Sequence, residues 1–248
     1  MIDLREYSYF YDGIPALDKV SLHVKENEKV ALIGCNGSGK STLLRVMAGL
    51  YFGKGKYSFK GNTVNKKSTN KEFRKKVGII FQNPESMIFN PSVYDEIAFS
   101  LKEFGFEDID DRVNTIAKEF DLVKILKTNP LNLSGGQKQK VVLASILVYE
   151  PELLLLDEPT AAMDPFTTGW FIDFLSDLDK SVVLATHDLG LAYEITQRAV
   201  VMDEKHKKLY DGDMESLFSD FEMLLSANLI HKHRHNHRRF FHSHYHLH

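Results

Sequence analysis

The chain has 248 residues, 43% of them hydrophobic, and a net charge of −3, values that suit one large domain, or one domain with an insertion, around a sizeable core. The acidic balance argues against a nucleic-acid-binding protein, and the single cysteine, Cys35, excludes an internal disulfide framework and favours a cytosolic chain. No apolar run approaches the ~20 residues that span a bilayer, and the N-terminus lacks the basic-then-apolar layout of a signal peptide.

The first part of the chain predicts strands on either side of a glycine-rich turn. Residues 2–11, 20–24 and 57–64 alternate apolar and polar residues, which is typical of antiparallel strands with one buried face. Residues 29–33 are instead a short apolar run, as in a buried parallel strand. Apolar residues then recur at helical spacing from residue 40 to residue 50, so a strand, a turn and a helix follow one another.

The middle of the chain, between about residues 92 and 150, predicts helices and no convincing strand. The stretches 92–105, 109–126 and 135–149 all have helical periods. We therefore expect a helical subdomain, from about residue 88 to residue 150, inserted into the rest of the domain.

The second half of the chain alternates strands with helices. Residues 152–158, 181–187 and 199–204 are buried-strand signals, and the segments 165–178 and 188–196 between them have helical spacing. This alternation indicates parallel strand–helix–strand units. The predicted fold class is therefore α/β, with a mainly parallel sheet, an antiparallel flank and an inserted helical subdomain.

The segment "GCNGSGKST" fits the phosphate-binding pattern G-x-x-x-x-G-K-[ST], with the required strand before it and helix after it. Glycines let the backbone N–H groups surround phosphates, and the start of the helix adds positive potential. Lys40 can reach the β- and γ-phosphates, and the Ser41 hydroxyl can bind Mg²⁺. The candidate phosphate-binding residues are Gly34, Asn36, Gly37, Ser38, Gly39, Lys40, Ser41 and Thr42.

Two acids follow the buried run "LLLL". Asp157 comes at the carboxyl end of that strand, where ligands gather in open α/β sheets, and can hold Mg²⁺. Glu158 is placed to orient or deprotonate an attacking water. Beside a phosphate loop, this pair predicts a nucleotide-hydrolysing site.

The segment "LSGGQKQK", Leu133 to Lys140, resembles the signature motif of ABC-transporter ATPases. Other motifs follow that family's order: Walker A at 34–42, a Q-loop, the signature, Walker B at 153–158, a D-loop and a switch histidine. The resemblance covers residues 1–230 and implies a P-loop NTPase fold of the ABC ATPase type. It adds these site residues: Tyr11, Gln82, Ser134, Gly135, Gly136, Gln137, Asp164 and His187.

The resemblance also implies roles. Tyr11 matches the aromatic residue that stacks on adenine, with Tyr9 as a near competitor. Gln82 should meet Mg²⁺ or the lytic water, which makes it a third Mg²⁺ ligand candidate beside Ser41 and Asp157. The implied catalytic residues are Glu158, His187, Gln82 and Lys40.

In this family two ATPase domains pair head to tail, and each ATP lies between Walker A of one subunit and the signature of the other. We therefore expect ATP and Mg²⁺ as ligands and either a homodimer or a heterodimer with a paralogous ATPase. The expected partners are integral membrane transporter subunits at the cytoplasmic face of the membrane, and no nucleic acid.

Two positions depart from the family pattern, since Ala161 begins the D-loop and Lys140 replaces the usual arginine.

The region "VGIIFQNPESMIFNPSVYDEIAF" resembles the Q-loop region of energy-coupling-factor (ECF) importers. The segment 216–230 resembles the C-terminal segment of the same group. Ser86 and Met87 depart from the acid–glutamine pair that is more usual there. Two alternatives stay open: an ECF importer for a vitamin or other substrate, and an unrelated exporter. ABC ATPases that act on DNA or ribosomes would show coiled-coil insertions or tandem cassettes, which this sequence lacks.

The last eighteen residues, 231–248, hold eight of the eleven histidines and four basic residues. We expect this tail to be disordered and to lie outside the ATPase domain. Closely spaced imidazoles suit Ni²⁺, Co²⁺, Cu²⁺ or Zn²⁺ and do not choose among them. Because the ECF importers that the chain resembles include systems for nickel and cobalt, the tail favours one of these two ions as cargo. The candidate ligands are His231, His233, His235, His237, His242, His244, His246 and His248.

Overall fold

The computed structural model describes the backbone of residues 1–237 and 240–247 and the side chains of residues 1–230. Its largest sheet has six strands in the order β10-β9-β3-β8-β7-β6, and all neighbours are parallel except β10 and β9. The strands are β3 (Lys29–Gly34), β6 (Val77–Ile80), β7 (Leu153–Asp157), β8 (Ser181–Thr186), β9 (Arg198–Met202) and β10 (Lys208–Asp213).

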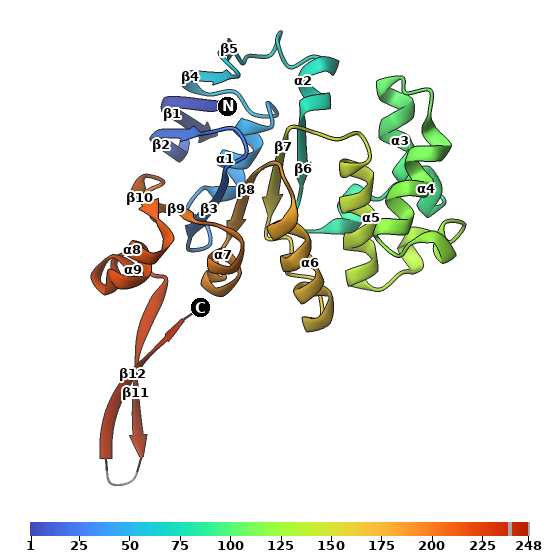
Figure 1. The fold of residues 1–248 in the computed structure, drawn as a ribbon. Helices are drawn as coiled ribbons and strands as arrows, with labels where there is room; N and C mark the ends of the chain where they lie inside the picture. The colour runs from blue at the N-terminus through green and yellow to red at the C-terminus, as the bar shows by residue number, and fades with distance from the viewer. Residues whose placement is uncertain (238–239, 248) are drawn as a thin grey trace.

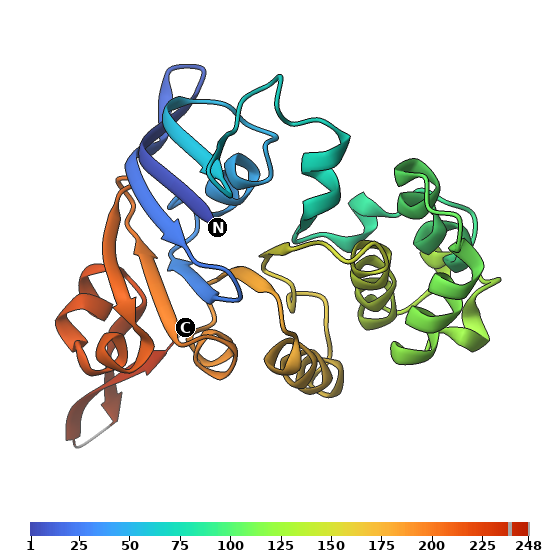
Figure 2. The same cartoon turned by 45° about the horizontal axis from the view of Figure 1, so that its top comes forward.

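A second, antiparallel sheet flanks the first, in the order β2-β1-β4-β5. Its strands are β1 (Ile2–Tyr11), β2 (Ile14–Val24), β4 (Lys54–Phe59) and β5 (Asn62–Thr63). The antiparallel sheet and the helices α3–α5 lie apart, joined through the parallel sheet (Figures 1 and 2). The predicted fold class, with its antiparallel flank and helical insertion, is confirmed.

Among the residues that it describes, the structure has a helix within each of the six stretches whose apolar spacing predicts one, and three further helices. The helices are α1 (Lys40–Met47), α2 (Lys71–Lys76), α3 (Val93–Phe104), α4 (Ile109–Glu119), α5 (Gly135–Leu147), α6 (Pro165–Asp177), α7 (Leu189–Ile195), α8 (Met214–Ser219) and α9 (Phe221–Ser226). Helices α2, α8 and α9 were not predicted. Short 3-10 turns occur at Pro84–Met87, Val123–Ile125 and Pro130–Asn132. Within the described ranges, none of the helices has the length and apolarity needed to cross a membrane.

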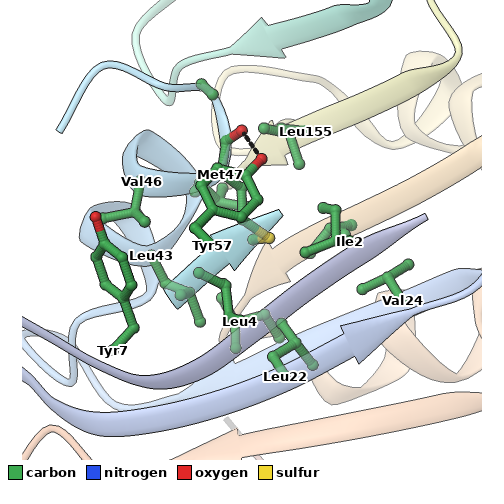
Figure 3. Packing of buried hydrophobic residues seen from close by; sticks show 14 of the residues in the cluster. Ile2, Leu4, Tyr7, Leu22, Val24, Leu43, Val46, Met47, Tyr57 and Leu155 are labelled. Carbon is green, nitrogen blue, oxygen red and sulfur yellow. Dashed lines mark hydrogen bonds between the residues drawn. The ribbon is translucent and has the colours of Figure 1, made fainter. Parts of the chain in front are cut away.

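The main core lies between the antiparallel sheet, helix α1 and one face of the parallel sheet (Figure 3). Ile2 and Leu4 of β1 point inward toward Met47 of α1, and the Tyr57 hydroxyl donates a 2.6 Å hydrogen bond to the Met47 carbonyl. Helix α2 joins the same core through Phe73, and the other face of the parallel sheet packs on helices of the set α3–α9. Because both faces are covered, β3, β7 and β8 read as continuous apolar runs, and this core fixes α1 against the sheet.

The order of the parallel strands determines which loops meet. Strand β8 lies between β3 and β7, with Ile33 opposite Thr186 and Asp157 opposite Ala185. The carboxyl ends of these three strands therefore lie at one edge of the sheet. The phosphate loop follows β3, the acidic pair lies at the end of β7, and His187 follows β8.

Some elements differ from the sequence predictions. The predicted helix 109–126 ends at Glu119, because Asp121 takes a left-handed conformation with φ 57° before a short 3-10 turn. Strands β6 and β10 were not predicted, because β6 has only four residues and β10 ends in Asp-Gly-Asp, residue types that are rare in strands. Strand β10 also pairs antiparallel at the sheet edge, which an all-parallel pattern does not indicate.

The tail also differs from the sequence prediction. Where disorder is expected from residue 231, the structure has an antiparallel hairpin of β11 (Ile230–His237) and β12 (Phe240–Leu247), which extends from the body of the molecule (Figure 1). Histidine alternates with other residues in this segment, and a two-residue period is that of a strand.

Candidate functional site

The phosphate loop connects the end of β3 to the start of α1. Gly39 has φ 104°, a left-handed conformation, and a Cβ at this position would lie 2.3 Å from the Ala16 carbonyl oxygen. Any residue other than glycine would therefore be both strained and in collision with β2. The tight turn lets the free N–H groups of the first turn of α1 face the loop.

Lys40 is the buried cation of this loop. Its Nζ donates to the carbonyl oxygens of Gly34 at 2.7 Å and Cys35 at 3.2 Å, and only 6% of the residue is exposed. Burial lowers the pKa of Lys40, and the charges of Glu158, Cys35 and Asp157 act against that shift. The structure thus places the Lys40 ammonium group near Asp157 and Glu158, which come from the end of a different strand, β7.

Ser41 and Asp157, both predicted Mg²⁺ ligands, lie in contact. The Ser41 hydroxyl donates to Asp157 Oδ1 at 2.9 Å, although 116 residues separate them in the chain. Asp157 is 3% exposed, and this burial raises its pKa against the opposing effect of the Ser41 hydrogen bond. A buried carboxylate with a single hydroxyl donor is a costly arrangement that a cation would relieve.

Glu158 and His187 form the third part of the site. Glu158 Oε1 lies 2.8 Å from His187 Nδ1, and Oε2 accepts a hydrogen bond from the Thr186 hydroxyl at 3.1 Å. The backbone of Glu158 is left-handed, with φ 47°, and its N–H donates to the Ala185 carbonyl at 2.9 Å. A strained residue that is anchored at both its backbone and its side chain is typical of a functional position.

Thr186 was not among the predicted site residues. It ends β8, is fully buried, and also accepts a hydrogen bond from the Asp188 N–H at 3.0 Å. In the sequence, the position directly before His187 is the one feature that singles out Thr186. Threonine is common in strands for purely structural reasons, so this position did not indicate a functional role.

The residues present fit a magnesium-bound nucleoside triphosphate. Ser38 Oγ is buried and has no hydrogen-bond partner among the residues that the structure describes, so this hydroxyl is free for a phosphate oxygen. Ser41 and Asp157 supply the oxygen ligands that Mg²⁺ prefers. These assignments of individual residues stay predictions.

The two tyrosines that compete for the base site differ in exposure. Tyr11 is 42% exposed and its hydroxyl lies 3.4 Å from Thr42 Oγ1, at the phosphate loop. Tyr9 is partly buried and packs against the main core. The geometry therefore favours Tyr11 as the ring available for stacking.

The signature residues begin helix α5. Ser134 caps the helix in a reciprocal pair of hydrogen bonds with Gln137. A Cβ at Gly135 would lie 2.5 Å from the Ala162 carbonyl oxygen, so the signature packs directly on the D-loop of the same chain. Helix α5 lies across β7 and β6 from α1 (Figure 1). The structure therefore keeps the signature away from the phosphate loop that precedes α1.

The remaining predicted residues have local roles or lie elsewhere. Asp164 caps helix α6, accepting from the N–H groups of Phe166 and Thr167 at 3.0 Å, and these hydrogen bonds lower its pKa. Gln82 follows β6 and is exposed. The tail histidines lie outside the described side chains, and His248 lies outside the described backbone. Among the described residues no group of three metal-ligating side chains occurs.

Comparisons with known proteins agree with this geometry. The family described as ABC transporter matches residues 17–161. A protein of Methanosarcina acetivorans, named for ATP binding in an ABC transporter with no cargo given, is 40% identical over 96% of this chain and 91% of its own. The nickel import ATP-binding protein NikO of Rhodobacter capsulatus is 39% identical over 92% of this chain and 95% of its own.

A solved structure extends the likeness to three dimensions. The structure is cbiO1 of Clostridium perfringens, described as part of the ABC transporter complex cbiONQ. It superposes with a TM-score of 0.79 at 29% sequence identity, over 92% of this chain and 94% of the other.

Proposed function

Because this chain belongs to the ABC transporter family of ATPases, we propose that it powers an ECF-type importer whose cargo is a transition-metal ion, nickel or cobalt. The coarser function follows from the family and its relatives: the chain is an ATP-hydrolysing subunit of an ABC importer of the ECF type. The identity of the cargo goes beyond what the family shows and is the part that we propose.

The observation that carries the cargo proposal is the similarity to the nickel import protein NikO along 92% of the chain. The composition of the tail supports it. In the backbone register of the tail hairpin, His231 lies opposite His246, His233 opposite His244, and His235 opposite His242. Neutral imidazoles in such numbers suit Ni²⁺ and Co²⁺, as they also suit Cu²⁺ and Zn²⁺, so the choice of nickel or cobalt rests on the similarity to NikO.

The residues at the sheet edge support the hydrolysis of ATP in separate roles. Lys40 places its buried ammonium where charge develops on the transferred phosphoryl group. Glu158 accepts a proton from the attacking water as the water oxygen bonds to the γ-phosphorus and the bond from that phosphorus to the oxygen of the departing ADP breaks. Mg²⁺, held by Ser41 and Asp157, would supply positive charge to the phosphate oxygens.

His187 and Thr186 act on the orientation of Glu158. Each oxygen of the carboxylate has one partner, at 2.8 Å and 3.1 Å. A base held on both oxygens cannot rotate away from the water it must orient. His187 is half exposed, with 52% of its side chain accessible, so it can also contact the terminal phosphate.

The signature serves the ATP of a second ATPase subunit, because it lies on the far side of β6 and β7 from its own phosphate loop. The N-terminus of α5 offers free N–H groups and a positive dipole to an anion. Dimer closure on two ATP molecules would then move the integral membrane subunits with which the chain associates.

Uptake measurements test the cargo. Cells that carry or lack this chain are compared for accumulation of Ni²⁺, Co²⁺ and vitamins, with Glu158→Gln as an inactive control. We expect uptake of one of the two metals to require the chain and to fall in the control. Dependence of vitamin uptake alone would refute the metal cargo while leaving the ATPase assignment intact.

A further inference from the structure

Three tyrosines form one cluster beside the phosphate loop. Tyr9 and Tyr51 stack with parallel rings, 5.0 Å between centroids and 6° between planes. The Tyr11 ring stands at right angles to both, 5.0 Å from Tyr9 at 81° and 5.8 Å from Tyr51 at 87°. Edge-to-face contacts of this kind are favourable because the positive edge of one ring meets the negative face of another.

The two stacked rings are fixed by the body of the molecule. Both Tyr9 and Tyr51 are partly buried and pack against the main core. Tyr51 follows helix α1, and its N–H donates to the Arg45 carbonyl of that helix at 3.3 Å. The position of the Tyr51 ring is thus set by the same helix that begins with Lys40.

Tyr11 is held although it is exposed. Its ring contacts the stacked pair, and its hydroxyl lies 3.4 Å from the Thr42 hydroxyl of α1. The Tyr11 side chain, and next to it burial, raises the pKa of Tyr51, so the two side chains are close neighbours. Tyr11 is 42% exposed. Without these contacts such a side chain would be free to move and would lose that freedom on binding a ligand, which would reduce the affinity.

We propose that Tyr9 and Tyr51 are positioning residues, which hold the Tyr11 ring ready to stack on the base of the nucleotide. Helix α1 then aligns both ends of the ligand, with Lys40 at its start serving the phosphates and Tyr51 beyond its end serving the base. The inference rests on the proposed ATP site, in which Tyr11 stacks on adenine.

The test compares the binding of Mg·ADP and of pyrophosphate to the full-length chain by titration calorimetry. Pyrophosphate has no base, so it reports on the phosphate loop alone. We expect Tyr51→Leu to weaken ADP binding about three- to tenfold, the effect of one lost aromatic pair, and to leave pyrophosphate binding unchanged. Tyr51→Phe keeps the ring and should restore ADP affinity to within about twofold.

Two further variants make the outcome decisive. Phe10 lies on the same strand as Tyr9 and Tyr11 and is 45% exposed. Phe10→Leu should leave ADP binding unchanged. Tyr9→Leu removes the other half of the stacked pair and replaces Tyr51→Leu if thermal melting shows that variant to be unfolded. Unchanged ADP binding in the variant used, or equal weakening of ADP and pyrophosphate, overturns the proposal.

Tyr11→Leu separates the two levels of the argument. If Tyr11→Leu weakens ADP binding while Tyr51→Leu and Tyr9→Leu do not, the positioning role is wrong and the base site stands. If Tyr11→Leu has no effect on ADP binding, both the base-stacking role of Tyr11 and the positioning role fail.

Discussion

Replacing Glu158 by glutamine removes the proposed base while keeping the shape of the side chain. Glutamine retains an oxygen and an amide group, so the contacts to Thr186 and His187, at 3.1 Å and 2.8 Å, can largely persist. We expect the free energy of unfolding to change by under about 1 kcal/mol, the net worth of one altered hydrogen bond. General base catalysis contributes about 10²- to 10⁴-fold, or roughly 3–5 kcal/mol of activation free energy.

The assay is phosphate release at saturating ATP, with nucleotide binding and thermal melting measured on the same samples. Glu150→Gln is the matched control, because Glu150 also has a left-handed backbone, with φ 56°, and an ion pair with Arg112 at 3.0 Å. We expect kcat to fall at least 100-fold in Glu158→Gln only, with ATP still bound. Undiminished hydrolysis in that variant would refute the assignment of Glu158 as the base.

Two further predictions concern the loop and its acid. Gly39→Ala should lower the free energy of unfolding by more than about 2 kcal/mol, because its Cβ would lie 2.3 Å from the Ala16 carbonyl oxygen. Gly37 has open space around its Cβ position, so Gly37→Ala should lower it by only about 1 kcal/mol. Urea unfolding measures both values. Equal costs would contradict the steric argument. Burial raises the pKa of Asp157, so its contribution to stability is lost as pH rises through that pKa. Asp157→Asn should therefore raise Tm at neutral pH, lose that gain in acid, and reduce Mg²⁺-dependent hydrolysis by about 100-fold or more; an unchanged Tm at neutral pH would count against it.

The parts of the site that the sequence predicts share one property. The residues of the phosphate loop are contiguous, so their spacing alone shows the strand, turn and helix that the chemistry needs. Asp157 and Glu158 follow an apolar run that is long enough to be recognised as a buried strand. Strand β6, of four residues, is too short for its period to be seen, although Gln82 depends on it for its place.

The contacts that the sequence does not show come from the third dimension. Nothing near Tyr51 indicates that its ring stacks on Tyr9, which lies on strand β1, 42 positions earlier. The hydrogen bond from Thr186 to Glu158 depends on the pairing of β8 with β7, which a sequence pattern does not order. The packing of Gly135 on Ala162 also requires the relative positions of α5 and the D-loop.

The central position of β8 restricts where the length of this chain can change during evolution. The register that sets Ile33 opposite Thr186 and Asp157 opposite Ala185 makes β8 a spacer of fixed length between two loops. Deleting one residue from it would draw His187 back by about 3.3 Å and turn each side chain between the deletion and His187 to the opposite face. Insertions and deletions should therefore be tolerated in the turn 203–207, between β9 and β10, and selected against between residues 181 and 187.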